Sequence, residues 1–174
     1  IKASYTKMNQ FLHQIPNSTA GLPTDIWVPS SIKTKPQSST QYGLGFYKNF
    51  MNNELETSME VYYKKMKNQV LFGEGKQLRI NIDLDSLLVY GNGESYGAEF
   101  YLKKNIGKLI GWISYTLSKT TQQFDDLNFG KEFPFRYDRR HVLSVAASYH
   151  LTKKWTLGAV FVYSTGAPFT IPAG

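Results

Sequence analysis

The chain has 174 residues, no cysteine and a formal net charge of +7. The missing cysteine excludes disulfides and thiolate metal sites. Because the lysines are scattered or lie at turns, the charge does not indicate nucleic-acid binding. No run of about eighteen apolar residues occurs, so the sequence predicts no transmembrane helix. Aromatic residues make up 15% of the chain, which suits β-strands and interfaces.

The first third of the chain predicts three strands. Side chains alternate between apolar and polar or small over residues 1–8, 41–49 and 55–66, and this period of two is typical of strands. Residues 9–40 lie between the first two strands, and their prolines predict a long irregular loop. These prolines are Pro16, Pro23, Pro29 and Pro36. Residues 51–54 predict a short turn between the second and third strands.

Two further strands are expected in the middle of the chain. Residues 68–94 form a second long connection, which contains glycines and a strand-like piece around residues 78–83. Alternation returns over residues 95–104 and 109–119, and a tight turn over residues 105–108 joins the two stretches. Trp112 falls on the polar side of its strand, and the sequence does not explain this placement.

The last part of the chain predicts a hairpin. After a polar, aromatic-rich connection over residues 120–140, strands over 141–150 and 155–164 flank a turn at 151–154. Strands of about ten residues rise about 25 Å when tilted by about 45°, which matches the apolar band of an outer-membrane barrel. The face opposite the apolar one carries small residues without charge, whereas a soluble sandwich usually carries charge on its outward face.

The lengths of the connections alternate between long and short along the whole chain. In an antiparallel meander this places all long connections at one end and all tight turns at the other, as in outer-membrane barrels. The sequence therefore predicts an all-β, up-and-down antiparallel meander that is part of a transmembrane β-barrel. Seven strands do not close such a barrel, so residues 1–174 are expected to be one part of a larger domain. The size class of plugged transporters, with about 22 strands, is favoured.

Alternation also predicts which side chains face lipid. On the second, sixth and seventh strands these are Tyr42, Leu44, Phe46, Leu143, Val145, Ala147, Leu157, Ala159 and Phe161. Glu56, Glu60 and Glu99 fall on the opposite face, which we expect to line the lumen. Tyr149, Trp155 and Tyr163 lie near the ends of the hairpin strands, where the edges of a membrane favour aromatic rings.

Several stretches together resemble the barrel domain of TonB-dependent outer-membrane receptors, most closely those of Bacteroidetes. They are residues 1–8, 22–29 with 35–37, 111–119, 137–141 and 163–166. The resemblance implies an outer-membrane protein that imports a scarce nutrient and is not an enzyme. It also implies a plug domain, and an N-terminal segment that contacts a TonB-type energy-transducing protein. Neither the plug nor that segment is expected within these residues.

No catalytic constellation and no metal-ligand spacing occur in the sequence, and no cofactor is predicted. His13, His141 and His150 are isolated from one another. The best candidates for contact with a nutrient ligand are aromatic or charged residues in the long connections, namely Trp27, Phe124, Phe133, Phe135, Tyr137 and Arg139. Such aromatic residues also form the cores of ordered loops, and Asp138 and Arg139 could instead form an ion pair that fixes a loop to the wall.

Two other functions fit the same pattern. A passive porin or adhesin shares the barrel but needs no plug and no energy coupling. A secreted, soluble β-sandwich that binds glycans shares the alternation, but it has no reason to sort its long and short connections to opposite ends.

Overall fold

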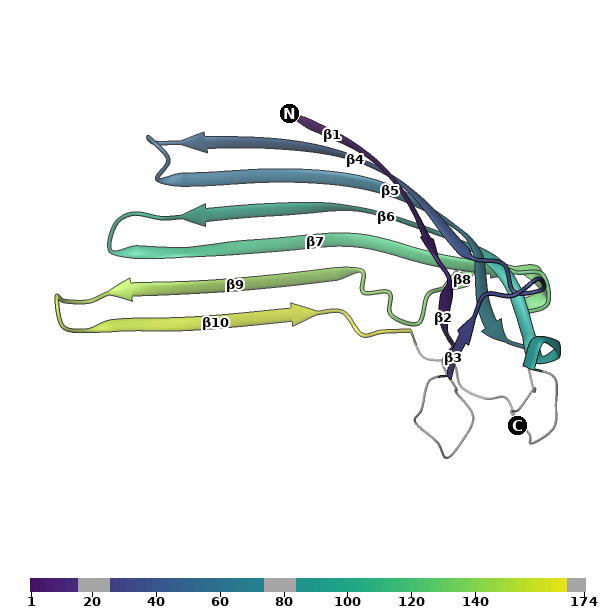
Figure 1. Cartoon of the computed structure of the whole chain (residues 1–174). Helices are drawn as coiled ribbons and strands as arrows, with labels where there is room; N and C mark the ends of the chain where they lie inside the picture. Colours follow the sequence, from purple (N-terminus) through teal and green to yellow (C-terminus); the bar gives the residue numbers. More distant parts are fainter. Residues whose placement is uncertain (16–25, 74–83, 169–174) are drawn as a thin grey trace.

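Seven long antiparallel strands dominate the computed structural model, which describes residues 1–15, 26–73 and 84–168. The strands are β1 (Lys2–Gln10), β4 (Gln37–Phe50), β5 (Leu55–Phe72), β6 (Leu88–Lys104), β7 (Leu109–Phe124), β9 (His141–His150) and β10 (Thr156–Ser164). They pair in this order to form one curved layer, and the short strand β8 (Phe133–Pro134) pairs with β7 (Figure 1). The predicted meander is therefore confirmed. Within the described ranges, no helix has the length and apolar character needed to cross a membrane.

Five strands run further than the sequence predicted, in each case at the end that carries the long connections. β1 ends at Gln10, β4 begins at Gln37, β5 ends at Phe72, β6 begins at Leu88 and β7 ends at Phe124, all inside segments expected to be loops. A register shift between β5 and β6, just after Met66, lets this ladder continue. These extensions escaped prediction because backbone pairing continues where the apolar alternation has already ended.

The long connection over residues 9–40 is not wholly irregular, as its prolines had suggested. It contains an antiparallel hairpin of β2 (Leu12–Ile15) and β3 (Ile26–Pro29), with Pro29 as the last residue of its strand. Proline is tolerated at such a position because no further ladder bond is required of it. Two short 3-10 helices, Leu84–Leu87 and Asn128–Gly130, lie in the other long connections. The strand-like piece predicted around residues 78–83 lies outside the described residues.

Tight turns and long connections are sorted to opposite ends of the sheet, as the sequence predicted. The turns after β4, β6 and β9 lie together on the left in Figure 1, and the long connections lie on the right. We call these the turn end and the loop end. The turn after β4 requires a left-handed backbone at Met51, Asn52 and Asn53, and asparagine tolerates this conformation better than most residues.

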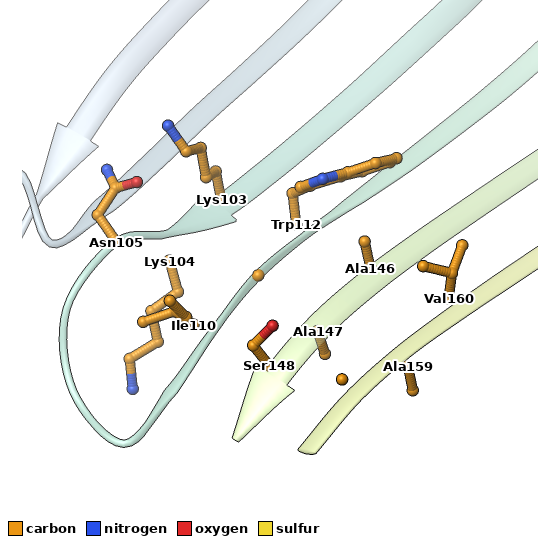
Figure 2. A pocket seen from close by; sticks show the side chains of 12 residues that line it. Lys103, Lys104, Asn105, Ile110, Trp112, Ala146, Ala147, Ser148, Ala159 and Val160 are labelled. Atoms are coloured by element: carbon orange, nitrogen blue, oxygen red, sulfur yellow. The ribbon is translucent and has the colours of Figure 1, made fainter. Parts of the chain in front are cut away.

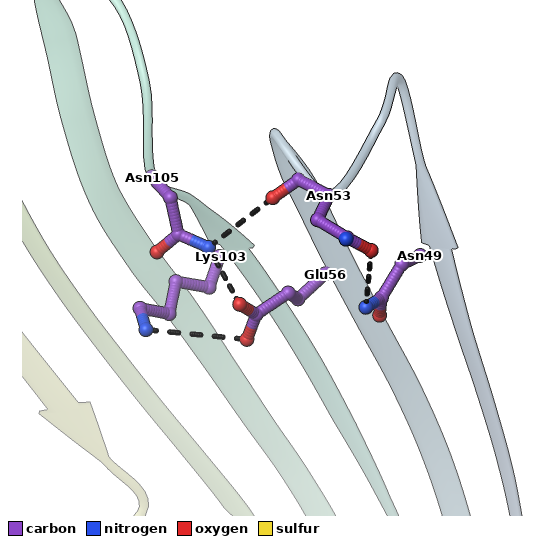
Figure 3. A network of polar contacts seen from close by, with 5 residues as sticks. All are labelled: Asn49, Asn53, Glu56, Lys103 and Asn105. Carbon is purple, nitrogen blue, oxygen red and sulfur yellow. Dashed lines mark hydrogen bonds and ion pairs between the residues drawn. The ribbon is translucent and has the colours of Figure 1, made fainter.

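A polar network joins two neighbouring turns at the turn end (Figure 3). The Asn105 side-chain amide donates to Glu56 Oε1 at 2.6 Å and to the Asn53 carbonyl at 3.5 Å. Lys103 Nζ lies 3.9 Å from Glu56 Oε2, and the Asn49 amide donates to Asn53 Oδ1 at 2.9 Å. These bonds fix the turn after β4 relative to the turn after β6.

One face of the sheet, which we call the apolar face, carries a continuous band of hydrophobic side chains. In register, Leu44 pairs with Val61, Val61 with Ala98, and Ala98 with Leu117, so the band runs unbroken across the central strands. The band continues on β9 and β10, where Val145 pairs with Phe161. Towards the loop end it is bordered by a row of paired tyrosines, Tyr5, Tyr42, Tyr63 and Tyr96.

The opposite face, which we call the polar face, carries small and polar side chains. Tyr47 donates a hydrogen bond to Glu60 Oε1 at 2.7 Å, and Glu60 pairs in register with Glu99, as expected for residues of one face. Tyr62 lies beside Gly97, where a side chain in place of the glycine hydrogen would come within 3.0 Å of the tyrosine ring. An aromatic ring that covers a neighbouring glycine helps to fix strand register.

Two small hydrophobic clusters stabilise the loop end of the sheet. One joins Val70 and Leu88 of the sheet to Ile15 and Val28 of the β2–β3 hairpin. The other joins Val89, Phe124 and Leu127, with Leu71 and Phe133 packed against it. Val70 and Leu71 are consecutive residues of β5, so the two clusters lie on opposite sides of the strand extensions. The extensions are therefore supported on both sides.

Candidate functional site

The ends of the strand extensions form a hollow at the loop end, on the polar face. Gln10 of β1 pairs in register with Gln37 of β4, whereas Gln69 of β5 pairs with Gly91 and Gln122 of β7 with Gly93. Their alternation places these glutamines on the polar face. Together with Gln14 they line a hollow of about 310 Å³, which we call the glutamine hollow.

Several amide groups in the glutamine hollow have hydrogen-bonding capacity to spare. Gln122 is 5% exposed and lines the hollow. Gln69 Nε2 donates a long bond of 3.5 Å to Gln37 Oε1, and Gln10 Nε2 donates to the Leu12 carbonyl at 2.6 Å. Each glutamine amide offers two N–H donors and one carbonyl acceptor, so the lining of the hollow suits a polar ligand.

Aromatic side chains form the other wall of the hollow. Phe133, Phe135 and Tyr137 all line it. The Phe135 and Tyr137 rings meet edge to face with centroids 5.4 Å apart, and the Arg136 guanidinium lies 4.9 Å from the centre of the Tyr137 ring. Among the described residues, Arg136 is the one charged residue of the lining, and its guanidinium lies over this ring.

Hydrogen bonds to β7 hold this aromatic segment in place. The Phe135 N–H donates to the Thr120 carbonyl at 2.9 Å, and the Thr120 N–H donates to Asp138 Oδ1 at 2.7 Å. Ser118 Oγ donates to the Arg139 carbonyl at 3.2 Å. The segment is therefore fixed to the wall, although Tyr137 itself is 60% exposed and open to a ligand.

The family of the chain follows from its sequence. A family model described as the β-barrel of TonB-dependent receptor-like proteins matches residues 8–173. The chain belongs to this family. No curated protein and no solved structure matches it. Members of the family are outer-membrane transport receptors and not enzymes, so the chain is part of the outer-membrane barrel of such a receptor, as its resemblance to TonB-dependent receptors implied.

Membership of this family identifies the apolar face as the side that meets lipid and the polar face as the side that lines the barrel interior. In an outer-membrane barrel the face with the apolar band meets lipid, and rows of aromatic side chains lie at the two edges of the membrane. The row from Tyr5 to Tyr96 then marks one membrane edge. Gln69 lies six positions beyond Tyr63 on β5, so the glutamine hollow lies outside the lipid, roughly 20 Å further along the strand.

The structure brings together three of the six predicted contact residues of the receptor, Phe133, Phe135 and Tyr137. Phe124 is fully buried under Phe133, with ring centroids 6.0 Å apart, so it offers no surface to a ligand. Its placement matches the alternative role of an ordered loop core. Gly91 has no side chain, and a Cβ atom there would come within 2.5 Å of the Phe124 ring, which explains how the ring fits.

The remaining two candidates lie outside the glutamine hollow. Trp27 is 56% exposed on β3 and does not line it. Arg139 donates to Ser164 Oγ at 3.1 Å, and the Asp138 carboxylate accepts from Thr120, so these neighbours form no ion pair with each other in the described part of the chain. Hydrogen bonds, rather than the ion pair considered from the sequence, connect this segment to the wall.

Sequence reasoning missed the five glutamines and Arg136. All five glutamines lie in segments expected to be loops, where alternation does not assign a side chain to either face of a sheet. Once the strands are extended, Gln37 and Gln122 fall on the face already predicted to be polar. A search for amide side chains on that face beyond the apolar alternation would have found them.

A second hollow, of about 390 Å³, lies at the turn end of the receptor wall and accounts for Trp112 (Figure 2). Trp112 points to the same side as Ala146 and Val160, whereas Ala147 and Ala159 point to the other side. Its ring stacks on Tyr101, with centroids 6.3 Å apart. Trp112 therefore fills space above small residues on the polar face, which is why it departs from the apolar alternation.

One buried histidine, His13, belongs to strand β2 of the β2–β3 hairpin. The His13 side chain is fully buried, and its Nε2 atom lies 2.9 Å from Ser30 Oγ, while Nδ1 has no hydrogen-bond partner among the residues that the structure describes. Burial lowers the pKa of His13 below its ordinary value of 6.5, because the charged imidazolium would lose its hydration. Among the described residues, no group of three or more His, Cys, Asp or Glu side chains could hold a metal ion.

Proposed function

We propose that this receptor imports a scarce nutrient across the outer membrane by energy-coupled transport. In this proposal the seven strands form part of the wall of a larger barrel of about 22 strands. A plug and a segment that contacts a TonB-type energy-transducing protein belong to parts of the receptor outside residues 1–174. We further propose that Phe133, Phe135 and Tyr137 contact the nutrient, and that the receptor is of the Bacteroidetes type.

The glutamine hollow is the observation that carries this proposal. Gln122, which is 5% exposed, and Tyr137, which is 60% exposed, both line this hollow outside the lipid. A passive pore needs no hollow lined by amides and aromatic rings, whereas a receptor that captures a dilute nutrient needs a concave site with a few polar groups. Trp27 and Arg139 also belong to the loop end and remain candidates for contact with larger ligands.

The free edges of the sheet support a larger barrel. β1 pairs only with β4, and β10 pairs only with β9, so each edge strand presents unpaired N–H and C=O groups within the described residues. Such groups are not tolerated in lipid, and a closed barrel satisfies them. The remaining strands of the receptor are therefore proposed to pair with β1 and β10.

Depletion of nutrients from growth medium tests the proposed function. Cells with the receptor, cells without it and cells treated with a protonophore are grown in the same complex medium, and the small molecules that remain are quantified by mass spectrometry. Energy-coupled import predicts at least one compound that only energised cells with the receptor remove. Removal that survives the protonophore would instead indicate a passive porin, and removal that does not depend on the receptor would refute import.

A further inference from the structure

We infer that a groove on the apolar face binds one anionic phospholipid, with its phosphate at Lys104 and an acyl chain along the wall. This inference concerns the lipid-facing side of the receptor, so it goes beyond the proposed function and does not depend on import. The groove consists of two hollows in the turn-end half of the band, of about 330 and 150 Å³. Leu102 and Ile113 line both hollows, so the two adjoin. We call them together the lipid groove.

Small residues on three neighbouring strands lower this part of the band. Gly111 pairs in register with Ala147, and Ala147 pairs with Ala159. One row further into the band, the corresponding residues are larger, namely Ile113, Val145 and Phe161. Gly111 cannot be enlarged, because a Cβ atom there would lie 2.8 Å from the Ala147 Cα atom. The depression is therefore built into the packing of β7 against β9.

The length of the lipid groove matches one leaflet of the membrane. Its far end is formed by Phe100 and Tyr115, whose rings stack with centroids 6.3 Å apart, and its near end by Leu109. Leu109 and Tyr115 are six positions apart on β7, a rise of about 20 Å, or about 15 Å across the membrane at a tilt of about 40°. Half of an apolar band of about 25 Å is about 12 Å. The groove therefore accommodates one acyl chain from the membrane edge to the midplane.

Lys104 places a positive charge at the turn end of the lipid groove. It lines the smaller hollow and lies two positions after Leu102 on the same face of β6. Figure 2 shows its side chain on the side of Ala147, opposite to that of Lys103. Its Nζ atom lies beside the turn, 3.8 Å from the position that a Cβ atom on Gly107 would take. The ammonium group is therefore at the headgroup level, while the stem of the side chain covers apolar surface.

The surroundings of Lys104 favour a headgroup with net negative charge. Strands β7, β9 and β10 carry no acidic residue, and the turns between them and β6 add three lysines, Lys108, Lys153 and Lys154. The His150 N–H donates to the Lys108 carbonyl at 2.8 Å, which holds the end of β9 against the turn before β7. Glu54 and Glu56 belong to the neighbouring turn after β4 and the start of β5, and Glu56 pairs with a lysine of the polar face. A basic cluster at the edge of the membrane attracts the phosphates of anionic lipids.

Native mass spectrometry of the purified full-length receptor in detergent tests the inference. The receptor is titrated with phosphatidylglycerol, phosphatidylethanolamine and phosphatidylcholine of identical acyl chains, and the bound lipids are counted to give the Kd of each. Glycerol 3-phosphate, which carries the phosphate without the chains, is titrated in the same way. We expect one phosphatidylglycerol to bind roughly tenfold or more tightly than the other two lipids, and glycerol 3-phosphate not to bind.

Two variants and two matched controls locate the lipid. Lys104→Gln removes the charge at the headgroup and Ala147→Leu fills the groove, so each should weaken binding of phosphatidylglycerol by roughly fivefold or more. Lys103→Gln removes the same charge from the polar face, and Ala98→Leu adds the same side chain to the apolar face outside both hollows. Both controls should leave the Kd unchanged. Because Lys104 is exposed, Lys104→Gln keeps the test valid if Ala147→Leu fails to assemble.

The outcomes separate a specific site from ordinary contact with the bilayer. One tightly bound phosphatidylglycerol that both groove variants weaken and both controls preserve supports the inference. Equal binding of all three phospholipids, binding of glycerol 3-phosphate as tight as that of the lipid, or equal Kd values for all variants overturns it. None of these outcomes involves the transported compound, so the proposed import is judged separately.

Discussion

Arginine on the apolar face of the wall should destabilise the receptor far more than arginine one residue away. Val145 lies halfway along β9, where it pairs with Ile113 of β7 and Phe161 of β10. It is equally far from His141 and Tyr149, which places it about 10 Å from each edge of the band at a tilt of about 40°. Val145→Arg therefore puts a charge near the membrane midplane, at a cost of about 2–4 kcal/mol.

Ser144 provides the matched control. It pairs with Ser114 and Val162 on the polar face, which meets the barrel interior rather than lipid. Ser144→Arg adds the same charge at the same depth, so it should cost about 1 kcal/mol or less. Ala159→Arg and Gly158→Arg form a second pair of opposite faces on β10, and the same difference is expected between them.

Equilibrium unfolding of the full-length receptor in lipid vesicles measures both costs. Guanidinium unfolding is followed by tryptophan fluorescence. The free energies of unfolding are compared between variants whose m-values, the slopes of this free energy against denaturant concentration, are equal. A larger loss for Val145→Arg than for Ser144→Arg is the expected result. Equal losses for the two variants would refute the assignment of this face to lipid.

Three other predictions follow from the structure. The β2–β3 hairpin should lose hydrogen-exchange protection as the pH falls below 6.5, because the pKa of His13 is lower in the folded hairpin than in the unfolded one, which therefore binds more protons. His13→Phe should remove this pH dependence. Protection that does not change with pH in the natural receptor would contradict the prediction. Single cysteines at Ile32 and Phe129 should react with an impermeant reagent on intact cells, whereas one at Ile106 should not, and the reverse pattern would invert the topology. Residues 1–174 alone, purified without detergent, should self-associate through the apolar face and the free edges of β1 and β10, and a stable monomer on size analysis would count against the barrel.

Alternation made the part of the wall within the membrane predictable. On one face, the side chains from Leu143 to Tyr149 and from Leu157 to Tyr163 must be compatible with lipid. The apolar alternation therefore determines the register in which these strands pair. The sorting of connections was predictable because asparagine marks the tight turns at 51–54 and 105–108, whereas prolines mark the long connection over residues 9–40. Sequence reasoning failed where lipid no longer constrains the side chains, and the predicted strands stop at Met66 on β5 and at Lys119 on β7 although the ladders continue.

The candidate site was only partly predictable. Phe133, Phe135 and Tyr137 were found because aromatic residues stand out in a polar segment. Gln69 and Gln122 were not, because a glutamine is common in loops and gains significance only when backbone pairing places it on a particular face. Phe124 was wrongly predicted to contact ligand, because the sequence cannot show whether an aromatic ring in a long connection packs inward. In the structure its ring packs against Gly91, which has no side chain.

The length of the strands lets the receptor wall cross the lipid in one part and line the candidate site in another. β5 has 18 residues, although about 9–11 suffice to cross an outer membrane. Its apolar band ends at Tyr63, and Lys65 Nζ lies 5.7 Å from the centre of that ring, as expected for a cation at the headgroup level. From Lys65 the strand continues for roughly 20 Å to Phe72. Because the extension belongs to the same hydrogen-bonded ladder and is packed on both sides, Gln69 is held as rigidly as the wall. Below Tyr63 the side chains must satisfy lipid, whereas above it the same backbone is free to present amides and aromatic rings to a ligand.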